Sequence, residues 1–327
     1  ILKIMFKKIK FFFQSEYIKN ITTLASGTFF SQLVVLFFLP ILSRIYNPEE
    51  FGLYSLFLSV SASIAIISTL TYDRAIVLPK EKDDANSIAI LSSILTLFVS
   101  LASFGILIVF DDFFIRYFGG NRFIIYLLPI RIFQVGLQQI FDELYIRNKF
   151  YKSLSFLRAS NSLFVSFIQF IYRYAYKLDG LIIGKFIGDC MLLLMSLAIH
   201  LREKTIVLQF FSFKSIKKVA AKYILFPKFY LPQILFNTIS LNIPFVLLPY
   251  FYSLEVAGLY GMAIRVLEQP IRLIATSTQS VYYQKASQMF SDQQNIYNLF
   301  QKTTTGLFRV LILPSVLIFI LGPQIFS

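Results

Sequence analysis

Arginine and carboxamide side chains recur at spacings of three and four residues inside strongly apolar parts of the chain. The fullest of these polar stripes comprises Arg265, Glu268, Arg272, Thr276 and Gln279. Two shorter stripes comprise Arg131, Gln134, Gln138 and Asp142, and then Gln233, Asn237 and Ser240. Side chains three and four residues apart share one face of a helix, so each stripe predicts a polar face on an apolar helix. Guanidinium groups suit phosphate-like anions and carboxamides suit hydroxyls, so the predicted chemistry is binding.

A charged side chain inside a membrane helix costs about 2.5–3.5 kcal/mol on insertion scales, and by default it faces a cavity or a partner. We therefore predict one shared aqueous cavity with these binding residues: Arg131, Gln134, Gln138, Gln233, Asn237, Arg265, Glu268, Arg272 and Gln279. The alternative is that Glu268 only neutralises Arg265 and Arg272, three residues before it and four after it. Lys185 and Asp189 are four residues apart, a spacing that favours an internal ion pair.

The composition requires a membrane for these helices. Of the 327 residues, 57% are hydrophobic and only 15% are charged, whereas a soluble domain carries about 25% charged residues. A single cysteine and a single histidine exclude a disulfide scaffold and a histidine or cysteine metal centre. We predict an all-α polytopic membrane protein, without metal or cofactor, with nine transmembrane helices near residues 21–43, 52–72, 87–110, 123–141, 156–176, 181–200, 229–250, 258–281 and 305–326.

Lysine and arginine are distributed unequally between the loops predicted on the two sides of the membrane. One side of the membrane receives 21 of the 31 basic residues and the other side receives five. The positive-inside rule then places the N-terminus in the cytoplasm. Most of the formal net charge of +14 is therefore explained by the basic residues of the predicted cytoplasmic loops. It predicts contact with membrane lipids and gives no reason to expect a nucleic-acid partner.

An internal repeat divides the chain. Tyr46-x-x-Glu49-x-x-Gly52-Leu53-Tyr54 recurs 206 residues later as Tyr252-x-x-Glu255-x-x-Gly258-Leu259-Tyr260. An even number of spans separates the copies, so the repeats run parallel about an axis along the membrane normal. This predicts a six-helix N-lobe over 1–205, a basic cytoplasmic linker over 206–228 and three helices of a C-lobe over 229–327. A whole second lobe would require about 410 residues or more, so we expect this chain to be part of a longer product.

Three stretches resemble the bacterial polysaccharide flippases, the O-antigen or capsule repeat-unit transporters of the multidrug/oligosaccharidyl-lipid/polysaccharide exporter superfamily. They are LASGTFFSQLVVLFFLPILSRIYNPEEFGLYSLFLSVSASI, VAGLYGMAIRVLEQPIRLIATSTQSVYYQKAS and the closing LGPQIFS. The resemblance implies a V-shaped two-lobe helical fold in the bacterial inner membrane. It also implies export of an undecaprenyl-pyrophosphate-linked oligosaccharide to the periplasmic leaflet, for lipopolysaccharide or capsule synthesis. Polysaccharide polymerase or glycosyltransferase machinery is then an expected partner.

Two other function classes compete with this interpretation. A membrane-embedded polymerase would share the hydrophobicity, but the predicted outer loops are short and the chain lacks the common nucleotide, hydrolase and zinc-protease motifs. We therefore predict no enzymatic activity and no catalytic residues. A multidrug or cation exporter of the same fold would need carboxylates in its cavity, whereas arginines outnumber Glu268 in the predicted stripes.

Overall fold

The computed structural model describes residues 16–176, 180–203, 212–267 and 295–326, together with residues 282, 286 and 289. Over these residues the chain is helical and contains no strand. The elements are α2 (Glu16–Ile45), α3 (Pro48–Ser68), η1 (Tyr72–Val77), α4 (Lys82–Val109), α5 (Asp111–Tyr117), α6 (Arg122–Arg147), α7 (Tyr151–Tyr176), α8 (Gly180–Arg202), α9 (Phe213–Lys222), η3 (Phe226–Tyr230), α10 (Leu231–Phe251) and α12 (Tyr297–Phe326). A further helix covers residues 254–267.

Among the described residues, seven helices are long and apolar enough to cross a membrane. They cover Thr23–Ile45, Pro48–Ser68, Lys82–Val109, Arg122–Arg147, Tyr151–Tyr174, Gly180–Arg202 and Phe226–Phe251. These seven correspond to the first seven predicted spans. The eighth continues beyond residue 267, outside the described residues, and the ninth coincides with the helix α12. The chain is therefore a multi-pass membrane protein, and the number nine stays a prediction.

Local sequence sets where two of the bundle helices begin. The turn before α3 places Asn47 ahead of Pro48, and the Asn47 backbone N–H donates to Glu50 Oε2 at 2.8 Å. Proline at the first helical position and an acid at the third suit this end, because the free N–H groups there carry partial positive charge. At the start of α6, Asn121 Oδ1 accepts from the backbone N–H of Phe123 at 3.1 Å. The Asn121 cap fixes the start of α6, the helix that carries the polar residues Arg131, Gln134 and Gln138.

In the described part of the chain, the buried core contains two hydrophobic clusters with a polar layer between them. One cluster is built around Phe51, Phe57, Phe118 and Ile124, and the other around Ile76, Ile88, Leu144 and Tyr145. Along α6 the first cluster ends at Leu128 and the second begins at Ile140. The side chains between them include buried Arg131 and Gln134. The fold therefore buries polar groups between two apolar clusters, where they must find partners within the protein.

Small residues bring α7 and α8 close together. Gly180, Gly184 and Gly188 are four residues apart on α8, the spacing that lets membrane helices approach closely. A Cβ atom on Gly184 would lie 2.8 Å from the backbone nitrogen of Gln169 on α7. This close approach places the polar residues of α7 within hydrogen-bonding distance of α8.

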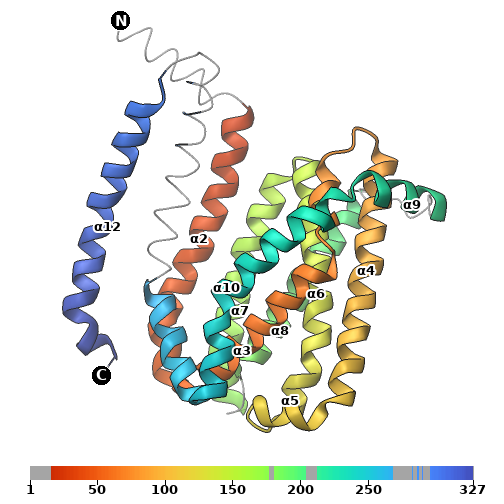
Figure 1. Ribbon diagram of the computed structural model, residues 1–327. Helices are drawn as coiled ribbons and strands as arrows, with labels where there is room; N and C mark the ends of the chain where they lie inside the picture. Colours follow the sequence, from red (N-terminus) through yellow and green to blue (C-terminus); the bar gives the residue numbers. More distant parts are fainter. Residues whose placement is uncertain are drawn as a thin grey trace, which may run out of the picture.

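Part of the predicted linker is ordered against the bundle. In α9, Ile216 and Val219 are buried, and Ala220 O accepts a hydrogen bond from the Tyr72 hydroxyl at 3.0 Å. Lys222 Nζ lies 3.1 Å from Asp84 Oδ2 on α4. The lysines of α9 therefore belong to a helix that packs on α4 and that the Tyr72 hydrogen bond joins to η1 (Figure 1). The division into lobes and linker stays a prediction.

The helices after this segment pack on α3. Both α10 and the 254–267 helix lie against it, and the rings of Phe245 and Tyr260 are 5.3 Å apart between those two helices. In Figure 1, α12 lies at one side of the molecule and α4 and α9 lie at the other. The first copy of the sequence repeat includes the start of α3, and the second copy includes the start of the 254–267 helix. The two copies therefore contact each other directly.

A candidate substrate cavity with an internal ion network

Asp189 organises the polar layer. Its Oδ2 pairs with Arg131 Nη1 of α6, and its Oδ1 accepts from Lys185 Nζ at 2.8 Å and from Asn161 Nδ2 of α7 at 3.1 Å. One carboxylate thus holds two cations and one amide from three helices. The predicted ion pair of Lys185 and Asp189 is confirmed, and the structure adds Arg131 to it. Pairing of this kind is required here, because an isolated charge in a low-dielectric interior is strongly unfavourable.

Two cavities flank this ion network. The first, which we call the α6–α8 cavity, has a volume of about 230 Å³ and is lined by Arg131, Gln134, Val135, Gln138, Gln139, Asp142, Asn161, Lys185, Asp189 and Leu192. The second, the α2–α8 cavity, has a volume of about 240 Å³ and is lined by Val35, Leu39, Leu42, Phe51, Tyr54, Leu58, Asn161, Ser162, Val165, Ser166, Gln169, Leu181, Lys185 and Arg265. Asn161 and Lys185 line both cavities, so they stand at the boundary between them.

Arg265 reaches the α2–α8 cavity from the 254–267 helix. Its guanidinium carbon lies 4.6 Å from the ring centre of Tyr54 and 5.6 Å from that of Phe51, both on α3. Its Nη2 atom lies 3.5 Å from Ser55 Oγ. Within the residues that the structure describes, no carboxylate pairs with Arg265. Aromatic faces stabilise a cation without neutralising it, so these ring contacts leave the guanidinium with its positive charge.

The predicted residues of α6 lie together in the α6–α8 cavity, where the protein already engages most of their polar groups. Gln134 Nε2 lies 2.6 Å from Cys190 Sγ, and Gln138 Nε2 donates to Asp142 Oδ1 at 2.8 Å. Gln134 Oε1 is buried without a hydrogen-bond partner. Buried polar atoms are normally satisfied, so this oxygen marks a position where a ligand group or a water molecule can donate.

Two further predicted residues belong to the described part of the chain, and neither lies at these cavities. Gln233 and Asn237 are exposed on α10 and line neither one. Glu268, Arg272 and Gln279 lie outside the described residues. The single shared cavity therefore stays a prediction, as does the alternative in which Glu268 neutralises Arg265. What the structure brings together is Arg131, Gln134 and Gln138 in one cavity and Arg265 in the neighbouring one.

Sequence reasoning missed the contribution of α7. Its polar cavity-lining residues are Asn161, Ser162, Ser166 and Gln169. The last three follow one another at the four- and three-residue spacings that identified the other stripes. The signal was present in the sequence, but serines in a membrane helix are weaker markers than arginines. Ser166 and Gln169 are buried, and Gln169 Nε2 donates to Leu181 O at 2.8 Å.

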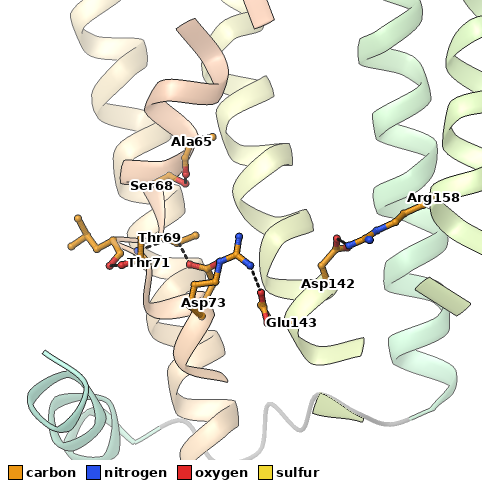
Figure 2. A network of polar contacts seen from close by, with 10 residues as sticks. Ala65, Ser68, Thr69, Thr71, Asp73, Asp142, Glu143 and Arg158 are labelled. Carbon is orange, nitrogen blue, oxygen red and sulfur yellow. Dashed lines mark hydrogen bonds and ion pairs between the residues drawn. The ribbon is translucent and has the colours of Figure 1, made fainter. Parts of the chain in front are cut away.

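A second ionic group closes the end of the bundle near η1. Arg74 Nη1 lies 2.6 Å from Glu143 Oε1, and its Nε lies 3.6 Å from Asp73 Oδ2. Thr69 Oγ1 donates to Asp73 Oδ1 at 2.7 Å. Figure 2 shows this cluster beside the pair formed by Asp142 and Arg158, which join α6 to α7. Burial raises the pKa of Asp73 above its ordinary value, while the Thr69 hydrogen bond and Arg74 oppose that shift. In the described part of the chain, no cluster of acid, histidine and cysteine side chains could hold a metal ion.

Comparison with known proteins shows the fold and the family of the chain. Its fold is similar to the inward-facing conformation of a multidrug resistance MATE family transporter of the MOP superfamily, with a TM-score of 0.64 and 14% sequence identity over 94% of this chain and 71% of that chain. An outward-facing multidrug resistance MATE family transporter matches with a TM-score of 0.47 and 14% identity, over 90% of this chain and 77% of that chain. No curated protein matches the chain. The family model described as polysaccharide biosynthesis protein matches residues 41–325. By this match over most of its length, the chain belongs to that polysaccharide biosynthesis family.

Proposed function

We propose that this protein exports an anionic, lipid-linked oligosaccharide from the cytoplasmic to the outer leaflet of the bacterial inner membrane by alternating access. The substrate class is an undecaprenyl-pyrophosphate-linked repeat unit for O-antigen, lipopolysaccharide or capsule synthesis. The family and the fold support a membrane exporter that acts in polysaccharide biosynthesis. The lipid tail of such a substrate can stay in the bilayer, so only its head group needs a polar route. Each unpartnered hydroxyl in hydrocarbon costs roughly 2–7 kcal/mol, so an oligosaccharide head cannot cross unaided.

The observation that carries the proposal is the charge of the cavities. Arg265 lies in the α2–α8 cavity without a carboxylate partner among the described residues, and Lys185 stands beside it at the boundary. The neighbouring cavity contains Arg131. Cations therefore exceed carboxylates along this route, which favours a substrate that carries negative charge. The predicted residues Arg272 and Glu268 would add one cation and one carboxylate, which leaves this excess unchanged.

The membrane potential can assist this direction of transport. With the cytoplasm negative, moving an anion outward is favoured by about 2.3 kcal/mol per charge per 100 mV. Export of a diphosphate head can thus be driven without ATP, in keeping with the absence of a nucleotide-binding motif from the sequence.

Transport into vesicles tests the proposal. The full chain is reconstituted in proteoliposomes, and movement of a radiolabelled polyprenyl-pyrophosphate sugar between leaflets is measured with and without a membrane potential. We expect transport of this lipid, and faster transport when the side that receives it is positive. Empty liposomes and liposomes carrying an Arg265→Ala chain are the controls.

A multidrug or cation exporter is the second candidate, because the solved structure with the similar fold is a multidrug transporter. Efflux of a cationic dye in the same vesicles, without movement of the labelled lipid, would favour it and overturn the proposal. Its weakness is the charge of the two cavities, since a cation exporter would place unpaired carboxylates there. In the α6–α8 cavity, Asp189 is paired with Arg131 and Lys185, and Asp142 is paired with Arg158.

A further inference from the structure

The groups around Asp189 form the kind of donor set that binds a phosphate. A guanidinium from α6, an ammonium from α8 and a carboxamide from α7 all point at one pair of carboxylate oxygens. Arginine and lysine bind phosphate oxygens with the same charge-assisted hydrogen bonds that they make to a carboxylate. The Asp189 carboxylate therefore occupies a position in which a phosphate group would also be stable.

The donor set has more capacity than Asp189 uses. Arg131 is only 8% exposed, and its Nε atom is buried without a hydrogen-bond partner. Asn161 Oδ1 and Gln134 Oε1 are buried without partners as well. All three residues line the α6–α8 cavity. Buried polar atoms left unsatisfied cost free energy, so the site gains when a larger polar group enters and engages them.

The net charge of Arg131, Lys185 and Asp189 also favours binding of a phosphate group. Two cations face one carboxylate, so the group as a whole keeps one positive charge in the low-dielectric interior. A diphosphate carries enough negative charge to neutralise both cations by itself. The cavity of about 230 Å³ equals the liquid volume of roughly seven or eight water molecules at about 30 Å³ each, which suits a small polar head group.

We propose that Asp189 is a built-in competitor for the substrate's diphosphate. It neutralises part of the charge on Arg131 and Lys185 while the site is empty, and the diphosphate displaces it on entry. This inference rests on the proposed function and adds a mechanism for it. The carboxylate keeps two buried cations from being stranded in the empty protein, and it lowers the affinity for the substrate so that the head group can leave again. A purely structural ion pair would instead be indifferent to the anion.

Binding of inorganic pyrophosphate to the purified full chain in detergent, measured by titration calorimetry, tests the competition. Asp189→Asn removes the competing charge and keeps a group that can accept a hydrogen bond. We expect it to bind pyrophosphate at least about tenfold more tightly than the wild type, which corresponds to about 1.4 kcal/mol. Asp189→Glu keeps the competitor, so its affinity should return towards that of the wild type. Equal or weaker binding by a folded Asp189→Asn protein overturns the proposal.

The matched control is Asp84→Asn. Asp84 also faces two lysines, Lys218 and Lys222, but it lies on the α4–α9 surface outside both cavities. Its replacement should leave pyrophosphate affinity within about twofold of the wild-type value. A gain equal to that of Asp189→Asn would show that any lost carboxylate strengthens binding by changing the net charge, and this too would overturn the proposal.

A second variant keeps the test decisive if Asp189→Asn does not fold. Lys185→Gln leaves Arg131 paired with Asp189 in a neutral group, so we expect it to fold and to lose pyrophosphate binding at least about tenfold. Wild-type affinity in Lys185→Gln contradicts the proposal.

Glycerol phosphate is the parallel probe, because it represents the head group of an ordinary anionic phospholipid. An Asp189→Asn gain that is as large for glycerol phosphate as for pyrophosphate overturns the diphosphate assignment.

The failure of this inference can be told from the failure of the proposed function. Transport of the labelled lipid, combined with unchanged pyrophosphate affinity in Asp189→Asn, keeps the function and rejects the competitor. A gain in pyrophosphate affinity in a chain that moves only cationic dyes keeps the competitor as an anion site and rejects the function.

Discussion

The backbones of Gly52 and Gly258 touch where α3 crosses the 254–267 helix. A Cβ atom on Gly52 would lie 3.1 Å from the backbone nitrogen of Gly258, and one on Gly258 would lie 2.9 Å from that of Gly52. The same Cβ atoms would overlap the carbonyl groups of Leu254 and Pro48, respectively. Gly258 and Leu254 follow Gly52 and Pro48 by the same 206 residues that separate the two copies of the sequence repeat. Such reciprocal contacts are what a local two-fold axis between the two copies produces.

Alanine at either glycine should destabilise this crossing. The added methyl group meets backbone atoms, which cannot rotate away, and overpacking of this kind costs typically about 1–3 kcal/mol. We expect Gly52→Ala and Gly258→Ala each to lower the thermal unfolding temperature in detergent. Gly105→Ala is the control, because nothing lies within 4 Å of its Cβ position in α4, and it should be neutral or slightly stabilising. Equal unfolding temperatures for all three variants would refute a tight crossing.

The repeat also pairs two tyrosines with opposite environments. Tyr46 is 2% exposed and its hydroxyl donates to Gln169 O at 2.6 Å, whereas Tyr252 is 75% exposed. Loss of the Tyr46 hydroxyl leaves a buried acceptor without this bond, so Tyr46→Phe should cost about 1–2 kcal/mol of unfolding free energy. Tyr252→Phe should stay within about 0.5 kcal/mol of the wild type. Chemical unfolding in mixed micelles measures both, and a larger loss from Tyr252→Phe would contradict the assignment.

Hydropathy and local spacing predicted most of the fold, because both act along the chain. The first seven spans could be predicted from the length of the apolar stretches, and the pair of Lys185 with Asp189 from their four-residue spacing. Arg131 lies 58 residues from Asp189 and on another helix, so no local rule could join them. Spacing shows which side chains share a face of a helix but not what packs on that face. Gln233 and Asn237 of α10 are exposed, and the cavity that they were predicted to line stays a prediction.

His200 shows the same limit. It lies near the end of α8, yet it is 1% exposed, and its ring centre lies 4.9 Å from that of Phe141 and 4.3 Å from that of Tyr145. The end of α8 is covered here by α6. Position along a span gives the depth of a side chain in the membrane, whereas its burial depends on the neighbouring helix.

Asp73 should make stability depend on pH in a specific direction. Burial raises its pKa above the ordinary value of 3.8, so the folded chain binds this proton more tightly than the unfolded chain. The contribution of Asp73 to stability therefore falls as the pH rises from 3.8 through the raised value. Asp73→Asn removes the ionisation and keeps an acceptor for the Thr69 hydroxyl. We expect its unfolding temperature, relative to the wild type, to be higher at pH 7 than at pH 4. A difference between the two proteins that does not change with pH would exclude this role.

Substitution of Arg265 tests whether the positive charge in the α2–α8 cavity is needed for transport. Its guanidinium lies against the rings of Tyr54 and Phe51 and lines the cavity that Lys185 borders. Lysine keeps the charge but loses the planar group that stacks on aromatic rings and binds phosphate through two hydrogen bonds. We therefore expect transport of the labelled lipid to fall at least about tenfold in Arg265→Ala, a loss of about 1.4 kcal/mol, and to fall by an intermediate amount in Arg265→Lys. Arg309→Ala is the matched control: this arginine is exposed on α12, and its loss should leave transport within about twofold. If both alanine variants lose transport equally, the effect belongs to net charge, and if neither does, the α2–α8 cavity does not receive the substrate.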